Sequence, residues 1–377
     1  MKYLVAGAGI SGAVIAERIA SVLGEKVLVI DCRKHTGGTA YSETVPETGI
    51  ECHRFGSHIF HTSCREVWDY IRKFTDFNTY QHKVLINARG KVYQMPINLK
   101  TINDFYGISL KPYEVQEFLA REAGSGAAGD ITNLEGKAIS QVGRKLYEAF
   151  ILGYTRKQWN CDPKQLPAEI ITRLTVRNNF DANYFSDPFQ GIPSNGYGKL
   201  FDNLLSHPGI EVLTGTDFRD IKSRLPADCA VFYSGSLDEL FDYQFGELGW
   251  RSLSFEWKNL PYQDWQGTAV MNYADLDTPY TRIHEFKHYH PERTEVFRSG
   301  KTTICVEFSK SYRKGMERFY PVNTAENRKK YEQYRSLLRG SRIIPIGRLG
   351  CYQYWDMDKA VKNSLDTFER IQKGLTA

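Results

Sequence analysis

The stretch KYLVAGAGISGAVIAERIASVLGEKVLVID, residues 2–31, decides the fold of this chain. Its apolar start, residues 2–6, predicts a buried strand, and the glycine-rich GAGISG of residues 7–12 follows at once. An apolar-faced helix is then predicted to about Leu23, and residues 26–30 predict a second strand. Strand, glycine turn, helix and strand in this order predict a βαβ unit of the kind that binds dinucleotides.

The glycines and one acid indicate how this unit would bind its ligand. Gly7, Gly9 and Gly12 allow a tight turn and let backbone N–H groups approach a pyrophosphate at a helix N-terminus. Asp31, nineteen residues beyond Gly12, lies where a carboxylate can bind the two ribose hydroxyls, and it disfavours a ribose 2′-phosphate. Residues 33–41, RKHTGGTAY, add a second glycine pair beside an arginine, which is typical of FAD proteins. We therefore favour FAD over NAD.

Length, composition and charge exclude several classes of protein. At 377 residues the chain exceeds the usual size of one hydrophobic core, so two or three interleaved domains are expected. The net charge of +5 is small, and no basic cluster is long enough to follow a nucleic-acid backbone, whereas an anionic small molecule would account for it. The chain contains no apolar run long enough to predict a membrane span.

Neither the cysteines nor the histidines form a metal-binding or disulfide pattern. The seven cysteines are scattered and include no C-x-x-C pair, so we expect reduced thiols in the cytoplasm. His53, His58 and His61 lie close together, but their spacing fits no zinc-binding pattern. The sequence therefore predicts no metal site.

The rest of the chain alternates between helical and β-rich regions. Residues 75–100 predict short strands and turns, and 101–176 an inserted group of helices; over 212–308 short β-rich runs return, which favours a substrate-domain sheet. A charged helix is predicted over 323–338, and a last helix over 357–374 returns to the nucleotide-binding unit.

These regions predict an α/β fold with three parts. The expected boundaries are residues 1–75, about 195–245 and 335–377 for an FAD-binding Rossmann-like domain; about 101–176 for a helical domain; and about 76–100, 177–194 and 246–334 for a substrate domain with a mostly antiparallel sheet.

Aromatic residues, 13% of the chain, cluster near arginines, notably around Arg177, Arg282 and Arg348. An arginine fork binds phosphate oxygens, and flat aromatic walls stack on a base, so this pattern suits a nucleotide-sugar. Taken one at a time, the same residues are also explained by core packing and surface ion pairs. The sequence contains no Ser-His-Asp order, nucleophile elbow, HExxH motif or placed carboxylate pair, so the flavin itself is expected to be the reactive group.

Eleven blocks of sequence together resemble the bacterial UDP-galactopyranose mutase family, over nearly the whole chain. They are GAGISG at 7–12, DxRxHxGGxAY at 31–41, HRFGSHIFHT at 53–62, GYTRKQW at 153–159, VRxxFDxNYFSD at 176–187, QGIP at 190–193, YxFG at 243–246, RSL at 251–253, PYTRIxE at 279–285, YPVN at 320–323, and GRL with YxYWDM at 347–357. The resemblance implies an FAD-dependent isomerase that interconverts UDP-galactopyranose and UDP-galactofuranose through attack of the reduced flavin N5 on the anomeric carbon.

The resemblance also implies roles for individual residues. Arg177 and Arg282 match the arginines that bind the departing pyrophosphate, while His58 and His61 are expected to face the flavin, where a purely structural role is equally open. The implied cofactor-binding residues are Gly7, Gly9, Ser11, Gly12, Asp31, Arg33, Gly38, Thr39, His58, Arg348, Asp356 and Met357. The implied substrate-binding residues are His82, Phe150, Tyr154, Thr155, Trp159, Arg177, Asn272, Arg282, Tyr320 and Tyr354.

A few positions depart from the family pattern near the flavin and the sugar. Thr39 and His82 stand where the family has asparagine, and His284-Glu285-Phe286 replaces the usual Ile-Glu-His. A modified or deoxy hexose nucleotide, of the UDP-N-acetylgalactose or TDP-fucose type, is therefore an alternative substrate. His61, however, matches the form that acts on plain galactose.

Two rival functions remain at the level of sequence. A flavin-dependent oxidase would share the dinucleotide unit but would turn over with oxygen and without a nucleotide-sugar. A non-catalytic nucleotide-binding protein would be suggested by loss of Arg177 or Arg282, and both are present. We further expect a cytoplasmic homodimer connected with cell-surface polysaccharide biosynthesis, with a nucleotide-sugar as its ligand and no nucleic-acid partner.

Overall fold

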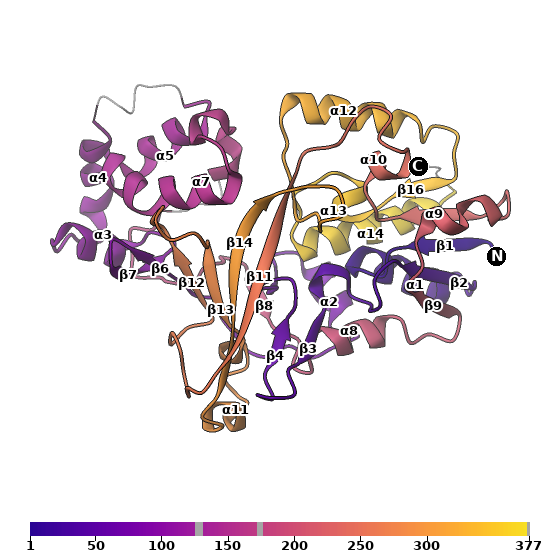
Figure 1. Ribbon diagram of the computed structural model, residues 1–377, viewed down its shortest axis with the longest axis horizontal. Helices are drawn as coiled ribbons and strands as arrows, with labels where there is room; N and C mark the ends of the chain where they lie inside the picture. The colour runs from indigo at the N-terminus through magenta and orange to yellow at the C-terminus, as the bar shows by residue number, and fades with distance from the viewer. Residues whose placement is uncertain (125–130, 172–175, 375–377) are drawn as a thin grey trace.

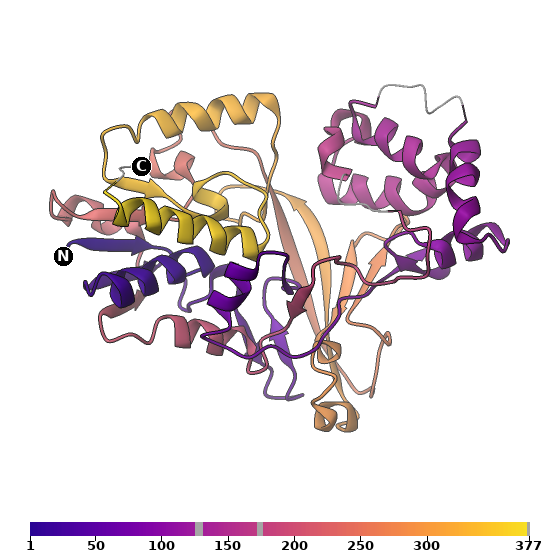
Figure 2. The same ribbon diagram turned by 180° about the vertical axis from the view of Figure 1, so that it is seen from behind.

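The computed structural model describes residues 1–124, 131–171 and 176–374. A parallel-sheet domain and a group of helices lie at opposite ends of the molecule, and a second sheet stands between them (Figure 1). The view from behind shows the same arrangement (Figure 2). The predicted helical region 101–176 includes residues 125–130 and 172–175, which lie outside the described part.

The parallel sheet contains the βαβ unit and has the strand order β16-β10-β1-β2-β9. Every neighbouring pair in it is parallel. Its strands are β1 (Tyr3–Ala6), β2 (Val27–Asp31), β9 (Ile210–Thr214), β10 (Ala230–Tyr233) and β16 (Ile343–Pro345). Side chains alternate between two cores: Val5 packs on one face of the sheet and Leu4 on the other. The predicted α/β class is thus confirmed.

Helices cover both faces of this sheet. On one face α1 (Ile10–Val22) packs against α14 (Met357–Gln372), and on the other α12 (Ala325–Ser336) contributes the buried Tyr331 and Tyr334. The flanking short elements are α2 (Arg65–Ile71), α8 (Gly196–Leu204), α9 (Phe218–Ile221), η7 (Lys222–Arg224), α10 (Leu237–Leu240), α13 (Gly347–Gly350) and η1 (Gly38–Ala40).

The second sheet has seven strands in the order β15-β11-β14-β13-β12-β6-β7. All pairs are antiparallel except β12 with β6. The strands are β6 (Val84–Ala88), β7 (Lys91–Met95), β11 (Trp250–Leu260), β12 (Val270–Tyr273), β13 (Arg282–Glu285), β14 (Thr302–Ser311) and β15 (Tyr320–Pro321). Two small pairs, β3 (Ser42–Thr44) with β4 (Glu51–His53) and β5 (Phe60–Thr62) with β8 (Phe189–Gly191), complete the strands of the described residues.

The helical group packs on one end of this sheet and shares one core with it. Asn98 and Asn133 cap the first turns of α3 (Leu99–Tyr106) and α5 (Leu134–Val142), because each side chain accepts a backbone N–H at 2.9 Å. The helices are α3 (Leu99–Tyr106), η2 (Pro112–Glu114), α4 (Val115–Ala123), α5 (Leu134–Val142), α6 (Arg144–Leu146), the π-helical η4 (Tyr147–Leu152), α7 (Gly153–Trp159), η5 (Pro163–Gln165) and η6 (Ala168–Ile171). The predicted domain boundaries stay a prediction.

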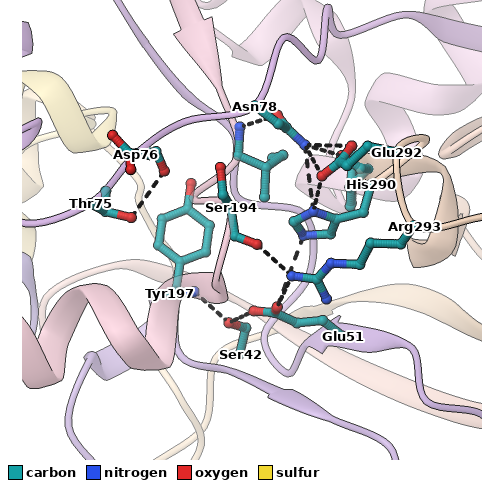
Figure 3. A network of polar contacts seen from close by, with 12 residues as sticks. Ser42, Glu51, Thr75, Asp76, Asn78, Ser194, Tyr197, His290, Glu292 and Arg293 are labelled. Carbon is teal, nitrogen blue, oxygen red and sulfur yellow. Dashed lines mark hydrogen bonds and ion pairs between the residues drawn. The ribbon is translucent and has the colours of Figure 1, made fainter.

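A network of polar contacts joins segments from distant parts of the chain (Figure 3). Arg293, just before α11 (Thr294–Arg298) and after η8 (Phe286–Tyr289), donates to the carbonyl of Ser194 at 2.6 Å and lies 3.4 Å from the buried Glu51. A Cβ at Gly196 would lie 1.8 Å from the Glu51 carboxylate, so only glycine fits there. Within the described ranges, no helix combines the length and apolar character that crossing a membrane requires.

Candidate active site

The first cavity, of about 400 Å³, lies at the carboxyl ends of β1, β2 and β10. Gly7 has a φ of +118°, and a Cβ there would lie 1.8 Å from Ser234 Oγ. A Cβ at Gly12 would lie 1.9 Å from the Gly7 carbonyl oxygen, so α1 can pack against the turn only with glycine at this position. The glycine pattern therefore has the structural role that the sequence predicted.

The second glycine pair closes the other side of this cavity. Gly38 faces Gly9 so closely that a Cβ on Gly38 would lie 3.1 Å from the Gly9 Cα. Asp31 orders the loops between them, since its carboxylate accepts the backbone N–H groups of Ala8 and Arg33, each at 2.8 Å. Two bare backbone turns facing each other leave room for a diphosphate that approaches main-chain N–H groups.

All the predicted cofactor-binding residues line this cavity: Gly7, Gly9, Ser11, Gly12, Asp31, Arg33, Gly38, Thr39, His58, Arg348, Asp356 and Met357. Asp356 precedes α14, so the positive end of a 16-residue helix points at the cavity. The buried Nε of Arg33 has no hydrogen-bond partner among the described residues. An open donor, a glycine cradle and a helix N-terminus fit a dinucleotide.

His58 lies at the edge of the first cavity and stays neutral. Burial lowers the pKa of its imidazole to about 4. Its Nδ1 lies 2.9 Å from the Gly56 carbonyl oxygen, so the proton of the neutral ring belongs on Nδ1. Nε2 then keeps a lone pair that can accept a hydrogen bond.

The second cavity is larger, about 950 Å³, and Asp356 lines both cavities. Its volume is at the upper end of the range for ligand pockets. It is lined by nine of the predicted substrate-binding residues: His82, Phe150, Tyr154, Thr155, Trp159, Asn272, Arg282, Tyr320 and Tyr354. The fold thus brings together side chains that are far apart in the sequence.

One wall of the larger cavity is a continuous helical run with a π turn in it, η4 followed by α7. This run carries Phe150, Tyr154, Thr155 and Trp159. A Cβ on Gly153 would lie 2.2 Å from the Ala274 carbonyl oxygen, so the helix backbone contacts the end of β12 directly. Single π turns of this kind are frequent at functional sites.

Two cations anchor α7 to the second sheet. The Lys157 ammonium lies 2.8–3.0 Å from the carbonyl oxygens of Tyr273, Asp275, Thr278 and Tyr280, so its three N–H groups are shared among four acceptors. Arg251 donates through Nε to the Gln158 carbonyl oxygen at 2.8 Å, near the negative end of the helix. The aromatic wall of the cavity is therefore fixed relative to the strands that face it.

Arg282 projects from β13 into the larger cavity and is paired with a buried acid. Its Nε lies 3.2 Å from Glu307 Oε1, and its Nη2 donates to the Tyr154 hydroxyl. The side chain of Glu307 is only 2% exposed. Burial alone would raise the pKa of Glu307, but the charge of Arg282 and the hydrogen bond from His284 lower it below its ordinary value. The site therefore contains a fixed, charged guanidinium.

Two tyrosines and Arg348 form the wall between the cavities. The rings of Tyr320 and Tyr354 lie 5.3 Å apart, and the Arg348 guanidinium is 5.9 Å from each ring. Arg348 donates to the carbonyl oxygens of Trp355 at 3.0 Å and Phe319 at 3.1 Å. Because both tyrosines line the larger cavity and Arg348 lines the smaller one, this cluster orders both sites at once.

Arg177 and His61 lie outside both cavity linings. Arg177 donates to Asp181 at 2.7 Å and to the Asn183 carbonyl oxygen. His61 lies 2.7 Å from Asp187 and stacks on Phe185 at 3.6 Å, so it is one layer behind the cavity wall. Their predicted contacts with substrate or flavin stay predictions.

Sequence reasoning missed Glu307, Ser57 and Tyr289. Only Glu307 had a usable signal, as a lone acid inside the apolar run of β14, where an unpaired charge would be costly. Ser57 lies within the block at 53–62 but, like Tyr289, carries no signal of its own that marks it as a site residue; both join the site through contacts across the fold.

The fold and its two adjoining cavities define an α/β enzyme that binds a dinucleotide-type cofactor beside a separate substrate site. Residues 149–354 match the family model described as UDP-galactopyranose mutase, and residues 5–74 match that of an NAD(P)-binding Rossmann-like domain. The chain is 39% identical to a dTDP-fucopyranose mutase of Escherichia coli over 370 residues, 97% of each protein. It is 38% identical to a probable UDP-galactopyranose mutase of Klebsiella pneumoniae, over 98% of this chain and 94% of that protein. The chain belongs to the UDP-galactopyranose mutase family.

The fold agrees with this membership. A crystal structure of reduced UDP-galactopyranose mutase superimposes with a TM-score of 0.75 at 16% identity, covering 100% of this chain and 94% of that one. The chain is thus an isomerase, a flavin-dependent mutase that interconverts the pyranose and furanose forms of a nucleotide-linked sugar. The family resemblance and the enzyme class predicted from the sequence are confirmed.

Proposed function

We propose that the protein interconverts UDP-galactopyranose and UDP-galactofuranose, with FAD in the glycine-lined cavity and the nucleotide-sugar in the larger one. The observation that carries the proposal is the junction of the two cavities at Asp356. A sugar at the inner end of the larger cavity would adjoin a cofactor in the smaller one. When bound, reduced FAD supplies the N5 nucleophile for the anomeric carbon.

The residues of the smaller cavity support FAD as the cofactor. Facing turns at Gly9 and Gly38 suit the diphosphate, and Asp31 lies at the end of β2 where a ribose would bind. The helix start at Met357 would direct N–H groups toward flavin carbonyl oxygens. His58 would accept a hydrogen bond at the flavin edge through Nε2.

The residues of the larger cavity support a nucleotide diphosphate. Arg282, with Tyr154 and Tyr320 beside it, would bind the phosphates and stabilise the charge that develops when the diphosphate leaves. Glu307 keeps the Arg282 guanidinium in place. Arg177 would join them only by giving up its ion pair with Asp181, which is 43% exposed, and its hydrogen bond to the Asn183 carbonyl oxygen.

The substrate sugar is either galactose or a modified or deoxy hexose. The relatives named for dTDP-fucopyranose and for UDP-galactopyranose match at 39% and 38% identity, so overall similarity favours neither. His82, buried on the wall of the larger cavity, supports the alternative of a modified or deoxy hexose. We also propose a cytoplasmic homodimer that serves cell-surface polysaccharide synthesis; the seven free cysteines fit a reducing compartment.

The test is chromatographic. Protein reduced with dithionite is incubated with UDP-galactofuranose, and in parallel with dTDP-fucose and UDP-N-acetylgalactose, and the products are separated by HPLC. We expect isomerisation of UDP-galactofuranose by the reduced protein and none by the oxidised protein. Equal turnover by the oxidised protein, or oxygen consumption in place of isomerisation, would contradict the proposal. Preference for another nucleotide-sugar would select the alternative substrate.

A further inference from the structure

Three side chains form a hydrogen-bonded relay that ends at the larger cavity. Ser57 Oγ lies 2.5 Å from His284 Nδ1, and His284 Nε2 lies 3.0 Å from Glu307 Oε2. Ser57 lines the larger cavity, while the next residue, His58, lines the smaller one. Consecutive residues of one loop therefore line the substrate site and the cofactor site.

The direction of the hydrogen bonds follows from the charges in the relay. Glu307 is paired with Arg282 through its other oxygen at 3.2 Å, so its carboxylate is ionised and can only accept. His284 must then donate to Glu307 from Nε2. The ring is fully buried, and this burial lowers the pKa of His284 even though the hydrogen bond to Glu307 and the charge of Glu307 raise it; the nearby charge of Arg282 also opposes a second proton. Nδ1 carries a lone pair, so the Ser57 hydroxyl donates to His284.

Tyr289 restricts Ser57 further. Its hydroxyl donates to Ser57 Oγ, and its fully buried ring stacks on His53 with centroids 5.1 Å apart, which fixes the donor. A serine oxygen has one proton and two lone pairs. The proton is committed to His284 and one lone pair to Tyr289, so Ser57 can offer the cavity one acceptor site and no donor.

The other polar groups near Ser57 differ from it in their hydrogen-bonding capacity. His82 Nδ1 is hydrogen-bonded to the Tyr80 hydroxyl at 3.1 Å, and the Arg282 guanidinium has only hydrogen-bond donors. Asn272 Oδ1 is buried without a partner among the described residues and lies on β12. The sugar end thus combines acceptors with a guanidinium. A hexose, whose hydroxyls both donate and accept, satisfies such a set.

We propose that Ser57, kept as a pure acceptor by His284 and Tyr289, is a specificity residue that accepts a hydrogen bond from one hydroxyl of the sugar ring. The proposal rests on the proposed function and deepens it. His284 is one of the positions at which this chain departs from the family pattern, with a relay-forming imidazole where isoleucine is usual. The relay thereby connects that departure to recognition of the sugar.

The test uses the flavin-loaded protein and a set of deoxygenated ligands. Dissociation constants are measured for UDP, UDP-galactose and its 2-, 3-, 4- and 6-deoxy derivatives, with wild type, Ser57→Ala and Ser57→Thr. We expect Ser57→Ala to weaken UDP-galactose by roughly 10-fold or more, since a site built to accept a hydroxyl loses that contact, and to leave UDP unchanged. One deoxy derivative should bind equally to wild type and Ser57→Ala, which identifies the hydroxyl. Ser57→Thr, which keeps the hydroxyl, should restore selectivity in part.

The control is Ser140→Ala on α5, which removes a serine hydroxyl that donates to the Lys137 carbonyl oxygen at 2.8 Å, within its own helix. It should alter none of these constants. The proposal is overturned if Ser57→Ala binds UDP-galactose as tightly as wild type does. It is also overturned if each deoxy derivative binds more weakly than UDP-galactose by the same factor in wild type and in Ser57→Ala. Failure of UDP itself to bind wild type would instead refute the proposed function, so the two failures are distinguishable.

Discussion

Replacing Arg282 by alanine should damage stability and turnover for two separable reasons. In the folded protein the guanidinium lies 3.2 Å from Glu307, whose side chain is 2% exposed. Arg282→Ala leaves that carboxylate buried without its counter-charge, and breaking a buried pair from one side costs about 3–5 kcal/mol of unfolding free energy. The same substitution removes the proposed contact to the leaving diphosphate, for which we expect a loss of at least about 100-fold in turnover.

A second substitution separates the two effects. In Arg282→Ala/Glu307→Gln the neutral amide needs no counter-charge, so most of the lost stability should return, whereas turnover should stay low. Unfolding free energies come from urea titrations, and initial rates come from the dithionite-reduced proteins. Glu307→Gln alone supplies the reference, because the ratio of the double variant to this single variant isolates the contribution of Arg282.

Two results would refute this reasoning. Turnover of the double variant within a few-fold of Glu307→Gln would mean that Arg282 serves only to neutralise Glu307 and does not bind the diphosphate. An Arg282→Ala protein as stable as wild type would mean that the pair does not behave as buried. Arg177→Ala is the matched comparison: its ion pair is with Asp181, which is 43% exposed and so contributes at most about 1 kcal/mol, and the loss of stability should therefore be smaller than in Arg282→Ala while turnover falls.

Three further predictions concern the walls of the two cavities. Gly153→Ala should lower Tm by several degrees and raise KM, because its Cβ would lie 2.2 Å from the Ala274 carbonyl oxygen and displace α7; thermal unfolding and steady-state rates measure this. Asp31→Ala should weaken flavin retention more than about tenfold, seen as flavin fluorescence released on dilution, since two loop N–H groups lose their acceptor. Burial lowers the pKa of His58 to about 4 and of His82 to about 3, so between pH 6.5 and 4 the unfolded state binds protons that the folded state excludes. The unfolding free energy should therefore decrease as the pH is lowered from 6.5 to 4, by up to about 1.4 kcal/mol per pH unit for each histidine. His82→Asn should make this decrease less steep. An unchanged slope would contradict the assignment.

Local sequence was sufficient for the cofactor side of the site. Tyr3–Ala6, the glycines and Ile10–Val22 follow one another without a gap, and each step is set by backbone geometry within a few residues. Gly7 has a positive φ and Gly12 has no space for a Cβ, so the pattern itself encodes the turn. For that reason the predicted residues between Gly7 and Thr39 line one cavity, whereas His58, Arg348, Asp356 and Met357 reach it from distant segments that only the family resemblance predicted.

The sequence was less informative about which way individual side chains turn. Arg177 was predicted at the substrate because its block resembles the family, but in this structure it pairs with Asp181, four residues further on. His61 likewise pairs with Asp187, 126 residues away. A motif gives the position of a residue on the backbone, while the choice among partners depends on the distances and burial around it.

The substrate side was decided by strand register, which no short motif contains. The antiparallel pairing of β13 with β14 sets Arg282 opposite Glu307 and His284 opposite Cys305. His284 is therefore diagonal to Glu307, within reach of its carboxylate, and Ser57 meets it from a loop 227 residues away. A slip of one residue would turn Arg282 and His284 to the other face of the sheet. The sequence by itself determined the nucleotide-binding unit and the family, because their signals are local; only the tertiary structure decided the ion pair, the relay and the junction of the cavities, because these depend on contacts between distant strands.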